Sequence, residues 1–250
     1  MKPRMIANLR VHTGEYEQFV HTIIEWGRMR RSSYVCLANV HMTIEAHDDP
    51  AFAEVVAGAD LVTPDGMPLL FALKSLHNIR QERVAGLDLM ESTLRQAEQE
   101  KLSVYFYGSD TTTLARIEEK IRKQCPQLVI AGMHSPPFRE LTPEERKQEI
   151  EEIKRSGAHI VMVALGCPKQ ERWMAGNKGK IHSVMIGLGG AFSVYAGLKK
   201  RAPAWMRRLS LEWLYRLGQE PKRLWRRYLY TNIKFLLVLG KQITKKSFGD

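Results

Sequence analysis

The chain has 250 residues, of which 44% are hydrophobic and 26% are charged, and its formal net charge is +11. These proportions are typical of a folded globular protein and exclude a disordered chain. The length is enough for one large α/β domain, or two modest ones, with a proper hydrophobic core.

Short apolar runs alternate with longer amphipathic stretches, which is typical of β-α units and a mainly parallel sheet. In residues 1–100 we expect a strand near 5–11, a helix at 15–29, a buried strand at 34–40, a helix at 43–57 interrupted around Pro50, a short strand at 61–63, and helices at 67–76 and 88–100. These elements belong either to the main sheet or to a second lobe, and both alternatives stay open.

The signals are clearer in the middle of the chain. Thr142 and Glu145 form a capping box with Pro143 at the first helical position, which predicts a helix that ends at Gly157. Further strands are expected at 103–107, 128–132, 159–165 and 184–188, and a further helix at 111–124. The order predicts a Rossmann-like α/β fold, with a mainly parallel sheet flanked by helices.

The excess positive charge lies in the last fifth of the chain. From Lys199 onward there are fourteen Lys or Arg residues and three acids, a net charge of +11, so residues 1–198 are neutral. A helix that starts at Pro221 places six large apolar or aromatic side chains at helical spacing: Trp225, Tyr228, Leu229, Ile233, Leu236 and Leu237. We therefore predict a catalytic body, residues 1–198, and a basic amphipathic appendage, residues 199–250, that meets an anionic partner.

Several classes of protein are disfavoured by what the sequence lacks. The three cysteines are widely spaced, which argues against a disulfide framework or a structural zinc site. There is no apolar signal-peptide region, and the longest apolar run near the end, 235–239, is far below the roughly 20 residues of a spanning helix. Metal-binding, P-loop and GxSxG motifs are absent. We expect metal-independent chemistry in a cytosolic or peripheral membrane protein.

Polar residues follow the ends of the predicted strands, where doubly wound sheets bind ligands. Asp65, in a Pro-Asp-Gly turn after the strand at 61–63, is a candidate general base, although most such triplets are plain turns. Asn39 and His41 follow the strand at 34–40 and are similar candidates. Gly108 either admits a nucleotide to the helix behind it or belongs to an ordinary capped turn.

Two further loops bear on the ligand. Lys169 lies in the first turn of a helix, where the helix dipole disfavours a cation, so an anion bound nearby explains it better than a solvated turn does. Gly189 and Gly190 belong to a GLGGAF turn, but Phe192 stands where a dinucleotide fingerprint has its third glycine. An NAD site is therefore disfavoured, whereas a close approach of this turn to another ligand stays open.

Taken together, six segments resemble the WecG/TagA/CpsF family of glycosyltransferases (glycosyltransferase family 26). They are NVH at 39–41, ADLVTPDGMPL at 59–69, ERVAGLDL at 82–89, GCPKQERW at 166–173, GLGGAFSVYAGLKKRAP at 187–203 and LEWLYRLGQEPKRLWRRY at 211–228. The resemblance covers about residues 35–235, and six segments in order are far more specific than any one motif. Two stretches depart from the family pattern, Ser193 after GGAF and HSPPF at 134–138, and both bear on donor choice.

The resemblance implies an inverting transfer of a sugar, such as N-acetylmannosamine or its uronic acid, from a UDP-sugar to a polyprenyl-diphosphate-linked GlcNAc in cell-surface polysaccharide or teichoic acid synthesis. It implies a Rossmann-type fold with an appendage that reaches the inner face of the bacterial cell membrane. Asp65 is then the general base, and Arg83 and Gln170 lie at the active site. The residues expected to bind substrate are Asn39, His41, Gly108, Lys169, Gly189, Gly190, Arg216, Arg223 and Arg226, the three arginines at the diphosphate.

Three other interpretations compete with this one. The basic aromatic tail also fits a nucleic-acid-binding protein, which predicts steeply salt-dependent binding and no UDP-sugar turnover. The remaining two are an NAD-dependent oxidoreductase and a non-catalytic membrane adaptor. We favour the glycosyltransferase, with no nucleic-acid partner; self-association into a homo-oligomer stays open.

Overall fold

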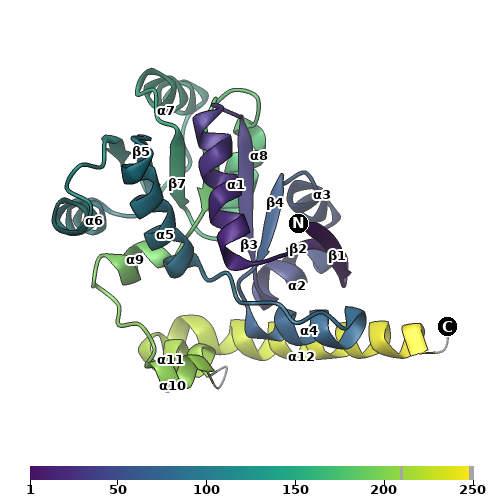
Figure 1. Ribbon diagram of the computed structural model, residues 1–250. Coiled ribbons are helices and arrows are strands. Elements are labelled where there is room, and N and C mark those ends of the chain that lie inside the picture. Colours follow the sequence, from purple (N-terminus) through teal and green to yellow (C-terminus); the bar gives the residue numbers. More distant parts are fainter. Residues whose placement is uncertain (209–210, 248–250) are drawn as a thin grey trace.

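The computed structural model describes residues 1–208 and 211–247, except for the side chains of Arg208, Arg223 and Ser247. Its centre is a six-stranded sheet with the order β4-β3-β8-β7-β5-β6, in which every pair of neighbours is parallel (Figure 1). The strands are β3 Ser33–Ala38, β4 Leu61–Pro64, β5 Val104–Gly108, β6 Ile130–His134, β7 Ile160–Ala164 and β8 Val184–Gly187. The predicted α/β class with a mainly parallel sheet is confirmed.

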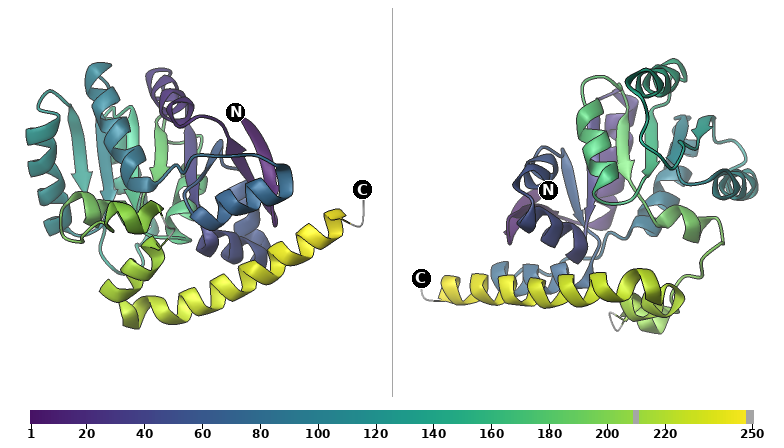
Figure 2. Two further views of the ribbon diagram at one scale, coloured as in Figure 1. Left: turned by 60° about the horizontal axis from the view of Figure 1, so that its bottom comes forward. Right: turned by 180° about the vertical axis from the view of Figure 1, so that it is seen from behind.

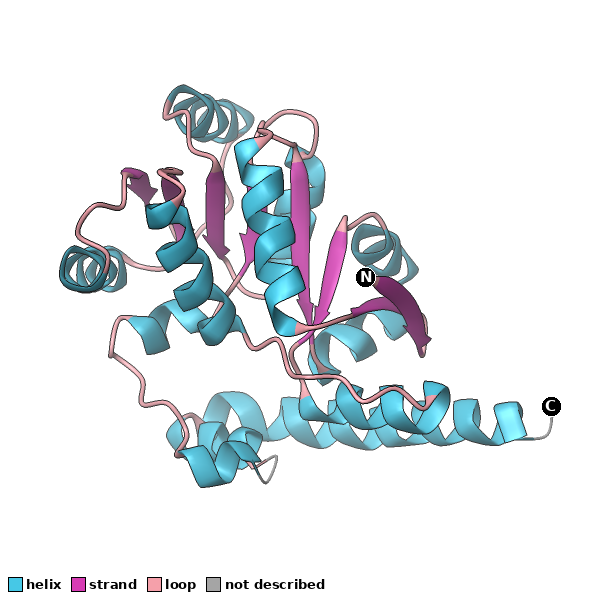
Figure 3. Cartoon of the chain, in the orientation of Figure 1, coloured by secondary structure: helices cyan, strands magenta, loops and turns pink. Residues whose placement is uncertain are grey.

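Helices cover both faces of the sheet (Figures 2 and 3). One face is covered by α1 Tyr16–Arg28, α5 Gly86–Gln99, α6 Thr111–Gln124 and α9 Ala191–Tyr195. The other is covered by α2 Val40–Asp48, α3 Pro50–Ala57, α4 Met67–His77, α7 Pro143–Arg155 and α8 Lys169–Asn177. Alternate side chains of β7 enter the two cores, Val161 and Val163 on one side and Ile160 and Met162 on the other, which explains why this strand is apolar throughout.

The amino-terminal part corrects one sequence expectation and places two strands whose position stayed open. The single strand near 5–11 is a hairpin of β1 Lys2–Ile6 and β2 Leu9–Thr13. Its turn places Ala7 at φ 53°. This left-handed conformation is uncommon for a residue other than glycine, and the turn contains neither glycine nor proline to indicate it. Of the two alternatives left open for this part of the chain, β3 and β4 belong to the main sheet, since both join the one six-stranded sheet.

Element boundaries shift where local capping decides them. The helix expected from residue 43 starts at Val40, because the Asn39 side chain caps it by accepting from the backbone N–H of Met42 (3.1 Å). The strand expected at 128–132 lies two residues later, at Ile130–His134. The capping box at Thr142 is present as predicted and starts α7.

The carboxyl-terminal segment forms three helices, α10 Ala204–Arg208, α11 Glu212–Gln219 and α12 Pro221–Ser247. The predicted start at Pro221 is confirmed. They lie on the side of the molecule toward which the strand arrowheads point, and α12 packs along α2 and α4 (Figures 1 and 3). No helix in the described part of the chain is long and apolar enough to cross a membrane.

α12 has one side against the body and one side exposed. Its buried residues are Leu224, Thr231, Phe235 and Leu239. Polar contacts along the same side join Lys234 Nζ to Asp48 (2.5 Å) and the backbone N–H of Ala7 to Gln242 Oε1 (2.8 Å). The exposed large side chains of the three helices, apart from Tyr230, whose hydroxyl donates to Asp48 (2.7 Å), are Trp205, Trp213, Leu214, Trp225, Leu229, Ile233, Leu236 and Leu237, which we call the appendage apolar surface.

The end of β5 yields a test of the fold. Gly108 has φ +106°, and an added Cβ would lie 2.6 Å from the carbonyl oxygen of Ala164 on β7. Because both the backbone conformation and the contact disfavour a side chain, Gly108→Ala is expected to lower the free energy of unfolding in urea by about 1–3 kcal/mol. The control is Gly176→Ala on α8, where no atom lies within 4 Å of an added Cβ; it should stabilise by about 0.5–1 kcal/mol. Equal changes in the two variants would contradict this account.

Candidate active site

Asp65 lies directly after β4, against the loop that follows β3. Its backbone N–H donates to the carbonyl of Ala38 (2.9 Å), which ties the ends of the two strands together. A Cβ on Gly66 would lie 3.3 Å from Cα of Asn39, so the two loops touch and only a glycine fits without a shift. The structure therefore places the candidates Asn39 and Asp65 side by side.

The segment before α5 brings Arg83 to the same place. The backbone N–H of Val84 donates to the carbonyl of Pro64 (3.0 Å), which holds this segment against the end of β4. Arg83 Nη1 donates to Glu212 Oε2 of α11 (2.8 Å). Body and appendage thus meet in an ion pair beside Asp65.

The environment of Asp65 makes it more basic than an ordinary carboxylate. The pKa of Asp65 is raised to about 6, and burial is the main cause. The charge of Arg83 opposes this rise, as do the charge of Arg216 and a hydrogen bond from the backbone of Gly86, while the charge of Glu212 acts in the same direction as burial. A carboxylate with a pKa near 6 is ionised at neutral pH and still holds a proton well, which suits a general base.

Gln170 fills the space between the loops that follow β7 and β8. It is buried; its Oε1 accepts from the backbone N–H of Gly166 (3.2 Å), and its Nε2 donates to Glu171 Oε1 (2.8 Å). A Cβ on Gly187 would lie 2.9 Å from its Nε2, and one on Gly189 would lie 3.2 Å from its Oε1. These two glycines therefore make room for the Gln170 amide.

Arg216 of α11 reaches the next glycine of this loop. A Cβ on Gly190 would lie 2.9 Å from Arg216 Nη2, and the charge of Arg216 also lowers the pKa of Asp65. The structure thus brings four candidates together. They are Asp65 after β4, Gly190 after β8, Arg83 from the segment before α5, and Arg216 from the appendage.

The two arginines of α12 whose side chains are described, Arg226 and Arg227, lie on different sides of the helix. The guanidinium of Arg226 is exposed and lies over the ring of Trp225 (5.3 Å to the centroid), so the structure does not bring it to Asp65. Arg227, three residues after the buried Leu224 and four before the buried Thr231, faces the body. The side chain of Arg223 lies outside the described residues.

Arg227 lies close to the candidate His41. On the packed helices α12 and α2, Lys234 contacts Asp48. Arg227 lies seven residues before Lys234 on α12, and His41 lies seven residues before Asp48 on α2, so both are about two helical turns away from that contact. Burial, followed by the charge of Arg227, lowers the pKa of His41 to about 4, so the ring is neutral at physiological pH. Arg227 Nε and His41 Nδ1 are buried without a hydrogen-bond partner among the described residues. His41 Nδ1 lies 3.6 Å from the Glu45 carboxylate, so the unpartnered Nε of Arg227 is the group that favours an anionic ligand at this point.

Other residues that the sequence placed at the site lie farther from Asp65 along the sheet. Gly108 ends β5, four strand positions from β4, a separation of roughly 19 Å. Lys169 is exposed in the first turn of α8, and Ser193 lies within α9. His134, from the departing HSPPF stretch, ends the far edge strand β6, where it stacks on Tyr107 (5.9 Å between ring centroids).

Sequence reasoning missed Arg227 and Glu212. The signal for Arg227 was the helical spacing from Leu224, but the sequence does not show which side of α12 faces the body. Glu212 was visible as an acid within a basic segment. Its role depends on Arg83, which lies far away in the sequence.

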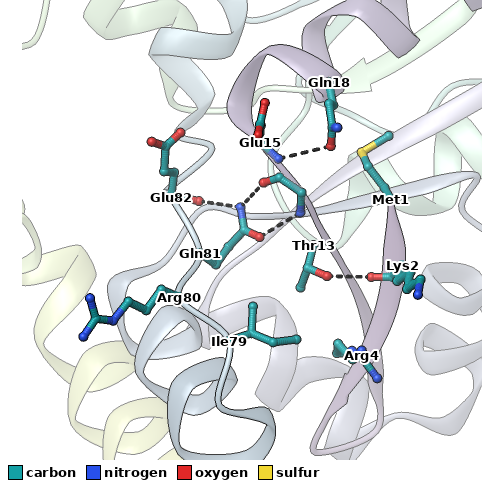
Figure 4. A pocket seen from close by; sticks show the side chains of 11 residues that line it. Met1, Lys2, Arg4, Thr13, Glu15, Gln18, Ile79, Arg80, Gln81 and Glu82 are labelled. Atoms are coloured by element: carbon teal, nitrogen blue, oxygen red, sulfur yellow. Dashed lines mark hydrogen bonds between the residues drawn. The ribbon is translucent and has the colours of Figure 1, made fainter.

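A separate hollow of about 540 Å³ lies between the amino-terminal hairpin and residues 79–82 (Figure 4). None of the candidate site residues lines it. Within it, Gln81 Oε1 accepts from the backbone N–H of Gly14 (2.9 Å), and Gln81 Nε2 donates to the Gly14 carbonyl (2.7 Å). These bonds fix the segment that carries Arg83. Among residues 1–208 and 211–247, no group of three or more His, Cys, Asp or Glu side chains could hold a metal ion.

Comparison with known proteins adds to this geometry. Residues 4–248 match the model of the "Glycosyl transferase WecG/TagA/CpsF family". The chain is 32% identical over 231 residues, 92% of its length and 88% of the relative's, to the N-acetylglucosaminyldiphosphoundecaprenol N-acetyl-beta-D-mannosaminyltransferase of Bacillus spizizenii (strain W23). It is 32% identical over 215 residues, 86% of its length and 82% of the relative's, to the protein of the same name in Bacillus subtilis (strain 168). The chain therefore belongs to the WecG/TagA/CpsF family of glycosyltransferases.

Proposed function

We propose that the protein transfers N-acetylmannosamine, or its uronic acid, from UDP to a GlcNAc linked through a diphosphate to a polyprenol, with inversion at the anomeric carbon. The names of the two Bacillus relatives support the acceptor and the sugar. The observation that carries the proposal is Asp65, a carboxylate of raised pKa beside Arg83 and Arg216. A base next to two cations suits a reaction in which a hydroxyl loses its proton and a diphosphate departs.

The transfer needs one in-line displacement. Asp65 accepts the proton of the acceptor hydroxyl while that oxygen forms a bond to the anomeric carbon of the donor. The bond from this carbon to the diphosphate breaks, and UDP leaves with the bonding electrons. The guanidinium groups of Arg83 and Arg216 neutralise the developing charge, so we assign charge neutralisation to arginines and not to a metal ion.

The donor then lies along the carboxyl ends of the strands. The ends of β4 and β8 carry Asp65 and Gly190, near which we place the sugar and its phosphates. The uridine extends toward Gly108 at the end of β5, where the glycine keeps the backbone bare and α6 begins three residues later. The roughly 19 Å between the ends of β4 and β5 suits the length of an extended nucleotide sugar.

The appendage presents the acceptor from the lipid side. The appendage apolar surface exposes two adjacent leucines of α12, Leu236 and Leu237, at 65% and 62%. Lys and Arg residues of the same helices give it positive charge. Such a surface suits the interface of an anionic bilayer, and we place the protein at the inner face of the cell membrane, where a polyprenol-linked acceptor is embedded.

Asp65→Asn tests the base. The variant is expected to fold like the parent and to lose about 10²–10⁴-fold in kcat, because the amide cannot take the proton. In the parent, kcat/KM should fall as the pH drops through about 6, since Asp65 is protonated below its pKa. Turnover with a short-chain acceptor is the measurement. A full-rate variant would remove Asp65 from the mechanism.

Arg227→Gln and its neighbour Arg226→Gln form a matched pair. Because Arg227 faces His41 and Arg226 is exposed over Trp225, Arg227→Gln should lower kcat/KM about 10- to 100-fold with a short-chain, water-soluble acceptor. Arg226→Gln should change it little. Equal losses in the two variants would show that the body-facing position of Arg227 has no bearing on substrate binding.

Flotation with phosphatidylglycerol-containing vesicles tests membrane docking. Replacing both Ile233 and Leu237 with Asp removes exposed apolar area and adds two negative charges, so the double variant should float much less than the parent. The control is Val129→Asp, an exposed residue that precedes β6, at the far edge of the sheet from β4. Docking through the appendage is ruled out if the double variant floats like the control.

A further inference from the structure

One acidic residue of the basic appendage lies at the candidate active site. Glu212 is the first residue of α11, and its Oε2 accepts from Arg83 Nη1 at 2.8 Å. Both side chains are largely shielded, with exposed fractions of 29% for Glu212 and 18% for Arg83. Because an ion pair shielded from water is screened less than a surface pair, this contact is strong enough to orient the guanidinium.

The pair leaves Arg83 with donors to spare. A guanidinium has five N–H groups in a fixed plane, and the bond to Glu212 uses one nitrogen, Nη1. Fixing that nitrogen also fixes the plane in which the remaining donors point. Arg83 can therefore stay paired with Glu212 and still contact a phosphate oxygen of the substrate.

Glu212 also acts on Asp65 through its charge. The groups that face Asp65 are Arg83 from the segment before α5, Gly86 from the start of α5, and Glu212 and Arg216 from α11. The two arginines and the Gly86 N–H lower the pKa of Asp65, whereas Glu212 raises it. Without Glu212, the cations that neutralise the leaving diphosphate would also weaken the base.

We propose that Glu212 is a positioning residue of the transfer reaction, which holds the Arg83 guanidinium in place and sets a compensating negative charge beside Asp65. This inference rests on the proposed function. The appendage then has two roles at the site. Docking of α11 adds the cation Arg216, and it also adds the carboxylate of Glu212, which keeps Asp65 able to accept a proton. The base is then fully competent only when the appendage is in place.

The test compares Glu212→Gln with Glu220→Gln. Glu220 follows α11 and pairs with Lys199 (2.9 Å), so the control also removes a carboxylate that forms an appendage ion pair. Glu212→Gln should move the acidic limb of the kcat/KM profile about one pH unit lower and reduce kcat about 3- to 10-fold at neutral pH. Glu220→Gln should leave the limb in place. A role limited to holding the appendage would lower activity without moving the limb.

A second readout needs no substrate. The full chain is labelled with ¹³C at the aspartate carboxyl groups, and the Asp65 resonance is assigned by its loss in Asp65→Asn. Its titration midpoint should lie lower in Glu212→Gln than in the parent or in Glu220→Gln. If Glu212→Gln fails to fold, Glu212→Asp replaces it. That variant keeps the charge but shortens the reach to Arg83, so kcat should fall while the limb stays.

The outcomes separate this inference from the proposed function. If the parent transfers sugar but Glu212→Gln matches Glu220→Gln in both the limb and the NMR midpoint, the role of Glu212 is overturned and the transferase stands. An unchanged kcat in Glu212→Asp would overturn the positioning of Arg83. If the parent transfers no sugar from any donor, the proposed function fails, and the NMR midpoints still decide whether Glu212 acts on Asp65.

Discussion

The desolvated carboxylate of Asp65 is the interaction on which the site depends. A buried charge is costly unless opposite charge and hydrogen bonds compensate it. Here the compensation comes from Arg83 and from Arg216, while Glu212 offsets part of it. The balance leaves Asp65 ionised at neutral pH but basic. Because Arg216 and Glu212 both lie on α11, the protonation of a residue in the body depends on the docking of the appendage.

The fold explains how groups so distant in the sequence meet. The parallel sheet brings the ends of β4 and β8 to one edge, where the loop after β8 lies beside Arg216. On the same side of the molecule, α12 is anchored by the buried Phe235 and Leu239 and by the Lys234–Asp48 contact. This anchoring leaves the opposite side of α12 exposed, and that side carries large apolar residues such as Leu236 and Leu237 together with the cation Arg226. One helix thereby serves both the packing of the site and the proposed contact with lipid.

Much of this arrangement could be predicted from the sequence, because it depends on local chemistry. The starts of α7 and α12 follow from the capping box at Thr142 and from Pro221, and the strands follow from their apolar runs. The hairpin at Ala7 was missed, since its turn offers only Asn8 as a turn-forming residue and places the alanine before it at φ 53°. Helical periodicity separates the two sides of α12, but only tertiary packing decides that Arg227 faces the body and Arg226 does not. The Arg83–Glu212 pair likewise appears only when body and appendage are placed together.

The most direct test of the account is a transfer assay with a panel of UDP-sugars and a short-chain polyprenyl-diphosphate-GlcNAc acceptor, with the anomeric configuration of the product read by NMR. The account predicts that UDP-N-acetylmannosamine, or its uronic acid, is consumed, that UDP is released, and that the product is a single anomer inverted relative to the donor. Absence of UDP release with every donor, or a product that retains the donor configuration, would contradict it.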